Sequence, residues 1–84
     1  MSHRATAGFW RCFEALPTAV QAVADKNFEL LKRDSRHPSL HLKRVKRFWS
    51  VRVGPHYRAL GTDLDEGILW YWIGTHAEYD RIVG

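Results

Sequence analysis

The side chains best suited to chemistry in this sequence are basic, and they are concentrated in one stretch of the chain. Residues 40–58 contain six lysines and arginines and no acidic residue, whereas residues 59–84 contain one basic and five acidic residues. Phe48, Trp49 and Tyr57 lie within the basic stretch. Because lysine and arginine displace the counterions of phosphates and aromatic rings stack on bases, this pattern indicates a polyanion-binding surface. A solvated basic face, or a surface for an acidic protein, has the same pattern.

Other kinds of site find little support in the sequence. The five histidines lack the spacing of metal ligands, and Cys12 is the only cysteine, so we expect no metal and no other cofactor. A glycine-rich phosphate-binding loop is missing. The lone cysteine, the lack of an N-terminal apolar region and the lack of a long apolar segment predict a soluble cytoplasmic protein without a membrane partner.

Hydrophobic periodicity predicts the elements that position these residues. Apolar residues recur at helical spacing between Val20 and Leu31, and Pro17 suits a first helical turn, which predicts a helix over about residues 17–33. The mixed composition of residues 3–13 indicates a short first strand or an extended arm.

Beyond Pro38 the hydrophobic period changes to two, which is typical of strands. The predicted strands and turns are a strand from Leu40, a strand over 49–53, a turn over 54–56, a strand over 57–60, an acidic turn over 62–67 and a strand over 68–73. The last strand is apolar on both faces, so we expect it to be central and covered by the helix on one side. The prediction is an α+β fold, with a small antiparallel sheet packed against an N-terminal amphipathic helix and a short C-terminal helical turn over 77–82, in one domain of residues 1–84.

Three segments of the chain, HPSLHLKRV (37–45), WSVRVGPHYRALG (49–61) and WYWIGTHAEYDRI (70–82), add more specific information. In their order and spacing they resemble the RelE/ParE toxin superfamily, and together they cover about half of the chain. The resemblance implies a small antiparallel sheet backed by an N-terminal helix or helical hairpin. It also implies the toxin half of a bacterial toxin–antitoxin pair. Many members cleave mRNA in the ribosomal A site, whereas the ParE branch inhibits DNA gyrase without an RNase site.

The resemblance also implies catalytic residues. Metal-free RNA cleavage needs a base for the 2′-hydroxyl, cations for the charged phosphorane and an acid for the leaving 5′-oxygen. His76, in the segment GTH, resembles the position of a catalytic histidine in several RNase members, and Arg52 and Arg58 match arginines at the two ends of RVGPHYR. Of the two arginines, Arg58 is the better candidate for stabilising the transition state. The alternatives are that His76 caps the last turn and that Arg52 forms an ion pair with Asp63, Asp65 or Glu66.

Further residues are predicted to contact RNA. His41 and His56 are candidates for a second histidine, and Tyr79 would stack on a base or orient His76, with surface and packing roles as the alternatives. Lys43 lies closest to family lysines that assist catalysis. The expected track for the phosphate backbone consists of Lys43, Arg44, Lys46 and Arg47.

The leading hypothesis is a toxin that cleaves mRNA at the ribosome, with a cognate antitoxin, mRNA and the ribosome as partners. Two alternatives stay open: a non-catalytic, ParE-like inhibitor of DNA gyrase, and a degenerate member that binds only its antitoxin. The sequence does not predict an oligomeric state.

Overall fold

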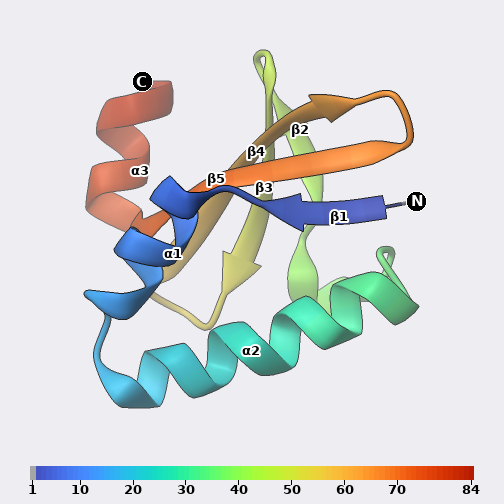
Figure 1. Cartoon of the computed structure of the whole chain (residues 1–84). Coiled ribbons are helices and arrows are strands. Elements are labelled where there is room, and N and C mark those ends of the chain that lie inside the picture. Colours follow the sequence, from blue (N-terminus) through green and yellow to red (C-terminus); the bar gives the residue numbers. More distant parts are fainter. Residues whose placement is uncertain (1) are drawn as a thin grey trace.

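The computed structural model describes residues 2–84 and confirms the α+β class (Figure 1). In chain order the elements are β1 (Ser2–Ala5), α1 (Ala7–Glu14), α2 (Thr18–Arg33), the 3-10 helix η1 (Pro38–Leu40), β2 (Lys43–Val45), β3 (Phe48–Val53), β4 (Tyr57–Leu64), β5 (Gly67–Thr75) and α3 (His76–Val83). The five strands form one sheet in the order β1-β5-β4-β3-β2. Neighbouring strands are antiparallel except for β1, which runs parallel to β5.

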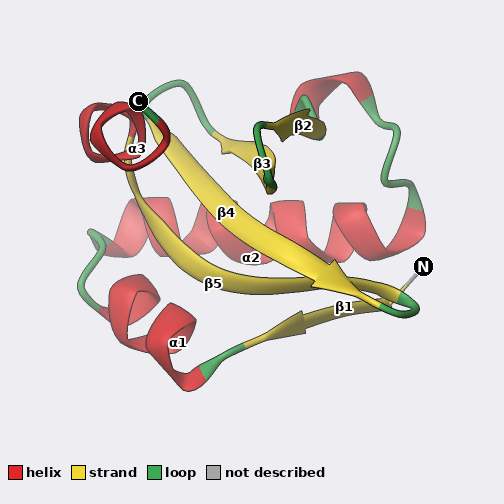
Figure 2. Cartoon of the chain, turned by 90° about the horizontal axis from the view of Figure 1, so that it is seen from above, coloured by secondary structure: helices red, strands yellow, loops and turns green. Residues whose placement is uncertain are grey.

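The sheet has helices on both faces, and the main core lies on one of them. In Figure 1, α2 runs beneath the sheet and α3 lies at its upper left; in Figure 2, seen from above, α2 passes behind β4 and β5. We call the face that packs on α1 and α2 the core face, and the opposite face, which meets α3, the outer face. The buried side chains of the core are Phe9 of α1, Ala24 and Leu31 of α2, Leu40 of η1 and, from the sheet, Val51, Val53, Ala59, Ile68, Trp70 and Ile73.

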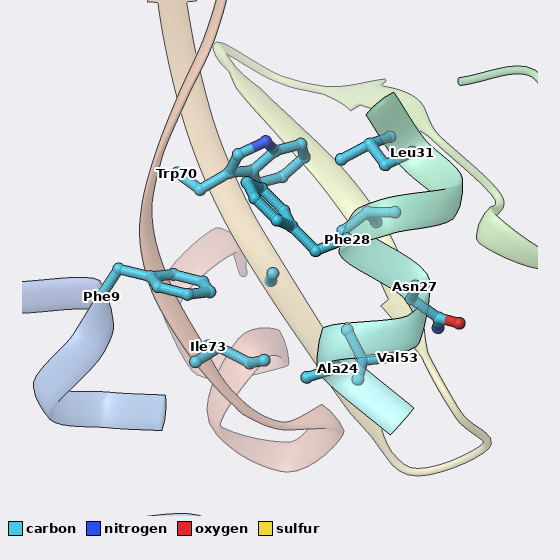
Figure 3. A pocket seen from close by; sticks show the side chains of 10 residues that line it. Phe9, Ala24, Asn27, Phe28, Leu31, Val53, Trp70 and Ile73 are labelled. Atoms are coloured by element: carbon cyan, nitrogen blue, oxygen red, sulfur yellow. The ribbon is translucent and has the colours of Figure 1, made fainter. Parts of the chain in front are cut away.

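A small cavity remains where α1, α2 and the sheet meet (Figure 3). Its volume is about 30 Å³, and its lining includes Phe9, Ala24, Phe28 and Trp70, with Asn27 as its one polar side chain. A space of this size and polarity is a packing defect and is too small for a substrate. The functional site therefore has to be sought on the surface.

Strand β5 carries one more residue than β4 between two of their paired positions. Leu60 pairs with Trp72 and Gly61 pairs with Trp70, which leaves Tyr71 without a partner. An extra residue of this kind forms a β-bulge, which changes the face to which the following side chains point.

The bulge explains why buried residues of β5 depart from the strict alternation of side chains along a strand. Ile68, Trp70 and Ile73 all belong to the main core, although the interval from Trp70 to Ile73 is odd. Gly61 makes room for them, because a Cβ atom there would lie 2.5 Å from Ile68 Cγ2 and 2.9 Å from Trp70 Cε3.

The N-terminal segment differs from the prediction in one element. The short first strand is present as β1, but residues 7–14 form a helix where no helix was predicted. The Thr6 hydroxyl caps this helix by accepting a hydrogen bond of 3.0 Å from the Phe9 backbone N–H. Phe9 and Phe13 then lie one turn apart, with ring centroids 6.5 Å from each other. The helix predicted over about residues 17–33 is confirmed as α2, and it ends at Arg33 as expected.

Two predicted boundaries were wrong. The strand expected from Leu40 begins only at Lys43, because residues 38–40 form η1 and His41 has a left-handed backbone with φ of 47°. The acidic turn is shorter than 62–67, since β4 extends to Leu64 and β5 starts at Gly67. The predicted C-terminal helical turn over 77–82 is confirmed as α3, which extends one residue further at each end, over His76–Val83.

Helix α2 also covers part of a sheet edge. Strand β2 pairs only with Phe48–Ser50 of β3, so residues 51–53 have no strand on that side. The Asn27 side-chain amide of α2 donates a hydrogen bond of 3.3 Å to the Arg52 carbonyl. This bond ties α2 to the edge of β3.

Strand β1 is attached to the sheet by its backbone and by one side-chain hydrogen bond. Trp70, which is 1% exposed, donates from Nε1 to His3 Nδ1 over 3.2 Å, and the two rings stack with centroids 6.2 Å apart. A ring nitrogen that accepts a hydrogen bond carries no proton, so this contact requires neutral His3. Burial lowers the pKa of His3 below its ordinary value of 6.5.

We predict that His3 makes the fold less stable in acid. Below pH 6.5 the unfolded chain binds a proton at His3 more readily than the folded chain, so stability should fall as the pH drops from 7 towards 5. His3→Gln keeps an acceptor for Trp70 but does not titrate, and its midpoint of urea unfolding should decrease less over this range. Equal decreases in the two proteins would contradict the role given to His3.

Candidate nucleic-acid interface

Two arginines lie side by side on the outer face. Arg52 of β3 and Arg58 of β4 are directly paired, and Arg58 is in turn opposite Gly74 of β5. Within residues 2–84 neither arginine forms an ion pair. Arg58 Nη1 donates to the Tyr57 carbonyl over 2.9 Å, and Arg52 Nε donates to the Gly54 carbonyl over 3.3 Å. Like charges on directly opposite residues repel, so a bound anion would stabilise this pair.

Two histidines meet at the same end of the sheet. The backbone N–H of His76, the first residue of α3, donates to the His56 carbonyl over 2.8 Å. His56 lies in the turn between β3 and β4, next to the Arg52–Arg58 pair in the chain. Both histidines are exposed. The fold thus gathers four of the predicted site residues, which lie 24 positions apart at most, at one end of the sheet.

His76 is held by its own helix. Its Nδ1 lies 3.1 Å from Asp80 Oδ2, one turn further along α3, and its ring centroid is 5.6 Å from that of Tyr79. With Nδ1 engaged by the carboxylate, Nε2 is the ring nitrogen left for a substrate. The helix cap is Thr75 and not His76, which answers the alternative considered for His76.

Thr75 and Glu78 form a capping box that sets the start of α3. The Thr75 hydroxyl accepts from the Glu78 N–H over 3.2 Å, and the Glu78 carboxylate accepts from the Thr75 N–H over 2.9 Å. The hydrogen bonds from the Thr75 backbone and hydroxyl lower the pKa of Glu78. The capping box therefore fixes the direction in which α3 leaves the sheet. His76 is the first residue of that helix, so its position is fixed as well.

Tyr79 is a packing residue in this structure. It is 6% exposed, and together with the fully buried Leu60 of β4 it lies outside the main core. Helix α3 contacts β4 and β5, so these two side chains fill the space between α3 and the outer face. Of the two functional roles predicted for Tyr79, orienting His76 fits this position better than stacking on a base.

The predicted phosphate track is divided between the two faces. Lys43 pairs with Ser50 and shares its outer-face register with Arg52, and Lys46 and Arg47 form the turn between β2 and β3. Lys46 has a left-handed backbone with φ of 56°.

Arg44 lies on the core face, apart from the other cations. Its guanidinium lies over the Trp49 ring, 4.6 Å from the centroid, and its Nη2 is 2.9 Å from Asp63 Oδ2. Trp49 Nε1 donates to the second Asp63 oxygen over 2.8 Å. These hydrogen bonds lower the pKa of Asp63, and the bond from Arg44 has the larger effect. The ion pair considered for Arg52 is thus formed by Arg44.

The strand order separates His41 from His76. His41 lies in the loop before β2, and the strand order places β3 and β4 between that strand and β5, which leads to His76.

One outer-face residue was not recognised as a site residue in the sequence. Tyr71 lies in the apolar run 68–73, where the sequence gives no sign of the bulge that separates it from the core residues.

The described part of the chain offers no metal site. Among residues 2–84, no three histidine, cysteine, aspartate or glutamate side chains are placed so that they could hold a metal ion. None of the helices in this range has the length and apolar character needed to cross a membrane.

Comparison with solved structures identifies the fold. A chain of the RelB–RelE antitoxin–toxin complex from Methanococcus jannaschii matches with a TM-score of 0.72 and 16% identity, over 93% of this chain and 96% of that one. A chain of the RelBE2 toxin–antitoxin complex from Mycobacterium tuberculosis matches with a TM-score of 0.64 and 22% identity, over 89% and 96%. A copper-bound mutant toxin from Helicobacter pylori matches with a TM-score of 0.60 and 16% identity, over 93% and 97%.

Comparison of sequences identifies the family. No curated protein matches the chain. The model of the ParE-like toxin domain matches residues 18–81, which include α2, the four antiparallel strands and most of α3. The resemblance noted in the sequence is confirmed: this chain belongs to the ParE-like toxin domain family, within the RelE/ParE superfamily of toxin–antitoxin proteins.

Proposed function

We propose that this toxin is a metal-free endoribonuclease that cleaves mRNA. The observation that carries the proposal is the pairing of Arg52 with Arg58, which have no acidic partner among residues 2–84, at the end of the sheet where the backbones of His56 and His76 meet. Metal-free RNA cleavage requires two kinds of protein group: cations that bind the phosphate and side chains that transfer protons. The protein would act in the cytoplasm.

The reaction follows from the chemistry of these side chains. The 2′-oxygen attacks the adjacent phosphorus and the bond to the 5′-oxygen breaks, which leaves a 2′,3′-cyclic phosphate and a 5′-hydroxyl. A base accepts the proton of the 2′-hydroxyl and an acid donates one to the leaving oxygen. In this proposal His76, oriented by Asp80, takes one of these roles, and the other is assigned to His56, whose backbone carbonyl accepts a hydrogen bond from the His76 N–H. The guanidinium of Arg58, supported by Arg52, donates paired hydrogen bonds to the non-bridging oxygens of the phosphorane.

The ribosome and an antitoxin complete the proposal. The two histidines are exposed on the surface of the protein, and the ribosomal A site would hold and bend the RNA over them. Lys43, Lys46 and Arg47 supply the charge that attracts the RNA. Two of the similar solved structures are toxin–antitoxin complexes, which supports an antitoxin partner for this chain.

A second candidate function is inhibition of DNA gyrase without catalysis. It is favoured by the family model itself, which is that of the ParE-like toxin domain. In that case the basic outer face would contact the target protein or its DNA, and His76 would have no chemical role. Binding to the antitoxin alone is the third alternative.

Substitution of His76 separates these functions. Expression of the protein without an antitoxin should arrest growth, and His76→Ala should relieve the arrest and slow single-turnover cleavage on programmed ribosomes by roughly 10²–10⁴-fold, as for a lost acid or base. Protein abundance and the unfolding midpoint are measured in parallel. A His76→Ala protein that is equally abundant and still fully toxic would sink the RNase proposal and favour gyrase.

Substitution of Arg58 separates geometry from charge. Lysine keeps the charge but cannot form two parallel hydrogen bonds to a phosphate, so Arg58→Lys should reduce single-turnover cleavage by roughly 10²–10³-fold with little change in affinity. Arg33→Lys, at the end of α2, is the matched control and should cleave normally. If Arg58→Lys weakens binding but cleaves at the normal rate once bound, Arg58 holds the RNA and does not stabilise the transition state.

We predict that removing a cation from the outer face changes the salt dependence of RNA binding, whereas removing one from the core face does not. Arg47→Gln removes an outer-face cation and should reduce the slope of log K against log salt by about 0.7, the value for one contact with a single strand. Arg44→Gln removes the same charge from a residue that pairs with Asp63 on the core face, so the slope should be unchanged. The measurement is anisotropy of a labelled RNA over a series of salt concentrations. Equal slopes for both variants would mean that the outer face does not carry the RNA.

A further inference from the structure

The outer face has a hollow of its own, apart from the arginines and histidines. It lies between the turn that joins β2 to β3 and the C-terminal end of α3. One wall is cationic and the other is apolar. The lining residues are Lys46, Arg47 and Phe48 on one side and Ile82, Val83 and Gly84 on the other.

Two aromatic rings from different strands meet beside this hollow. The ring centroids of Phe48, in β3, and Tyr71, in β5, are 6.3 Å apart, although β4 lies between their strands. Tyr71 reaches this position because it is the unpaired residue of the bulge. Both side chains are partly exposed. Together they present an aromatic surface next to the hollow.

Cations lie next to the aromatic surface. The Arg47 guanidinium lies over the Phe48 ring, 5.5 Å from its centroid. Burial raises the pKa of the Tyr71 hydroxyl above its ordinary value, and the charge of Arg47 offsets part of this rise. In the part of the chain that the structure describes, neither Lys46 nor Arg47 forms an ion pair. Opposite them, Ile82 is 44% exposed. A ligand that fits has a flat apolar ring and a negative charge beside it.

The hollow is too far from the arginine pair to belong to the same phosphate. Phe48 and Arg52 are four positions apart in β3, which corresponds to roughly 13 Å along the strand. A group bound here is therefore a neighbour of the nucleotide that is cleaved.

We propose that this hollow binds a nucleotide flanking the cleavage site, with its base stacked on Phe48 and its phosphate held by Lys46 and Arg47. This inference rests on the proposed function, since it supposes that the outer face binds RNA. Stacking on an aromatic ring is available to every base, so the subsite supplies affinity and register more than sequence preference. Ile82 covers the base from the side of α3.

The test compares stacking with charge. The probes are a fluorescein-labelled single-stranded RNA and an abasic oligomer of the same length and charge, and affinity is measured by anisotropy. Wild-type protein should bind the base-bearing RNA more tightly than the abasic oligomer. Phe48→Leu should lower affinity for the base-bearing RNA by roughly 5- to 100-fold, as expected for one lost stacking contact, and leave affinity for the abasic oligomer within about twofold. Phe48→Tyr should restore the wild-type behaviour.

The matched control is Trp10→Leu. Trp10 is an aromatic residue of α1 that is 43% exposed and lies away from the outer face, so its loss should change neither affinity. Equal losses in Trp10→Leu and Phe48→Leu would overturn the proposal. So would equal binding of the two probes by wild-type protein, a comparison that needs no variant and is unaffected by any folding defect.

A second measurement distinguishes failure of the subsite from failure of the proposed function. Wild-type protein and Phe48→Leu are compared in single-turnover cleavage on programmed ribosomes, where the variant should need about 5- to 100-fold more protein for half-maximal rate. If wild-type protein cleaves and the variant is indistinguishable from it, the subsite is wrong and the nuclease stands. If wild-type protein neither cleaves nor binds the RNA, both proposals fall together.

Discussion

The extra residue in β5 determines which side chains each face of the sheet receives. Without it, Trp70 and Ile73 would point in opposite directions, and one of them would be lost from the core against α1 and α2. With it, both are buried, and Tyr71 and Trp72 are left for the outer face. Gly61 permits the close approach of Ile68 and Trp70 that this arrangement demands. The position of the core and the aromatic composition of the outer face thus follow from the same irregularity.

The parts of the fold that were predictable are those in which one periodicity persists. Helix α2 keeps its apolar spacing for four turns, and its end at Arg33 was predicted. Helix α1 has only eight residues, too few for a helical repeat to stand out from a mixed composition. The left-handed backbone of His41 and the bulge at Tyr71 depend on tertiary packing, and a sequence period carries no information about either.

The candidate site shows a similar division. Arg52 and Arg58 lie on the polar positions of two predicted strands joined by a short turn, and the register of β3 and β4 pairs them on one face. The partner of Asp63 did not follow from the sequence: Arg52 was the candidate, but it lies on the outer face, whereas Arg44 lies on the core face and forms the ion pair. That His56 would adjoin His76 also required the sheet, since a backbone hydrogen bond between distant turns is invisible in composition.

The bond from Asn27 to the Arg52 carbonyl has a consequence for self-association. An uncovered strand edge is a template on which other chains add their own strands, and this is a common route to aggregates. Strand β2 protects only the first half of β3, and Asn27 occupies a carbonyl in the half that it leaves open. Helix α2 therefore hinders strand addition at this edge in addition to packing against the core face. Loosening α2 would free this carbonyl and leave residues 51–53 open to pairing with the strand of another chain.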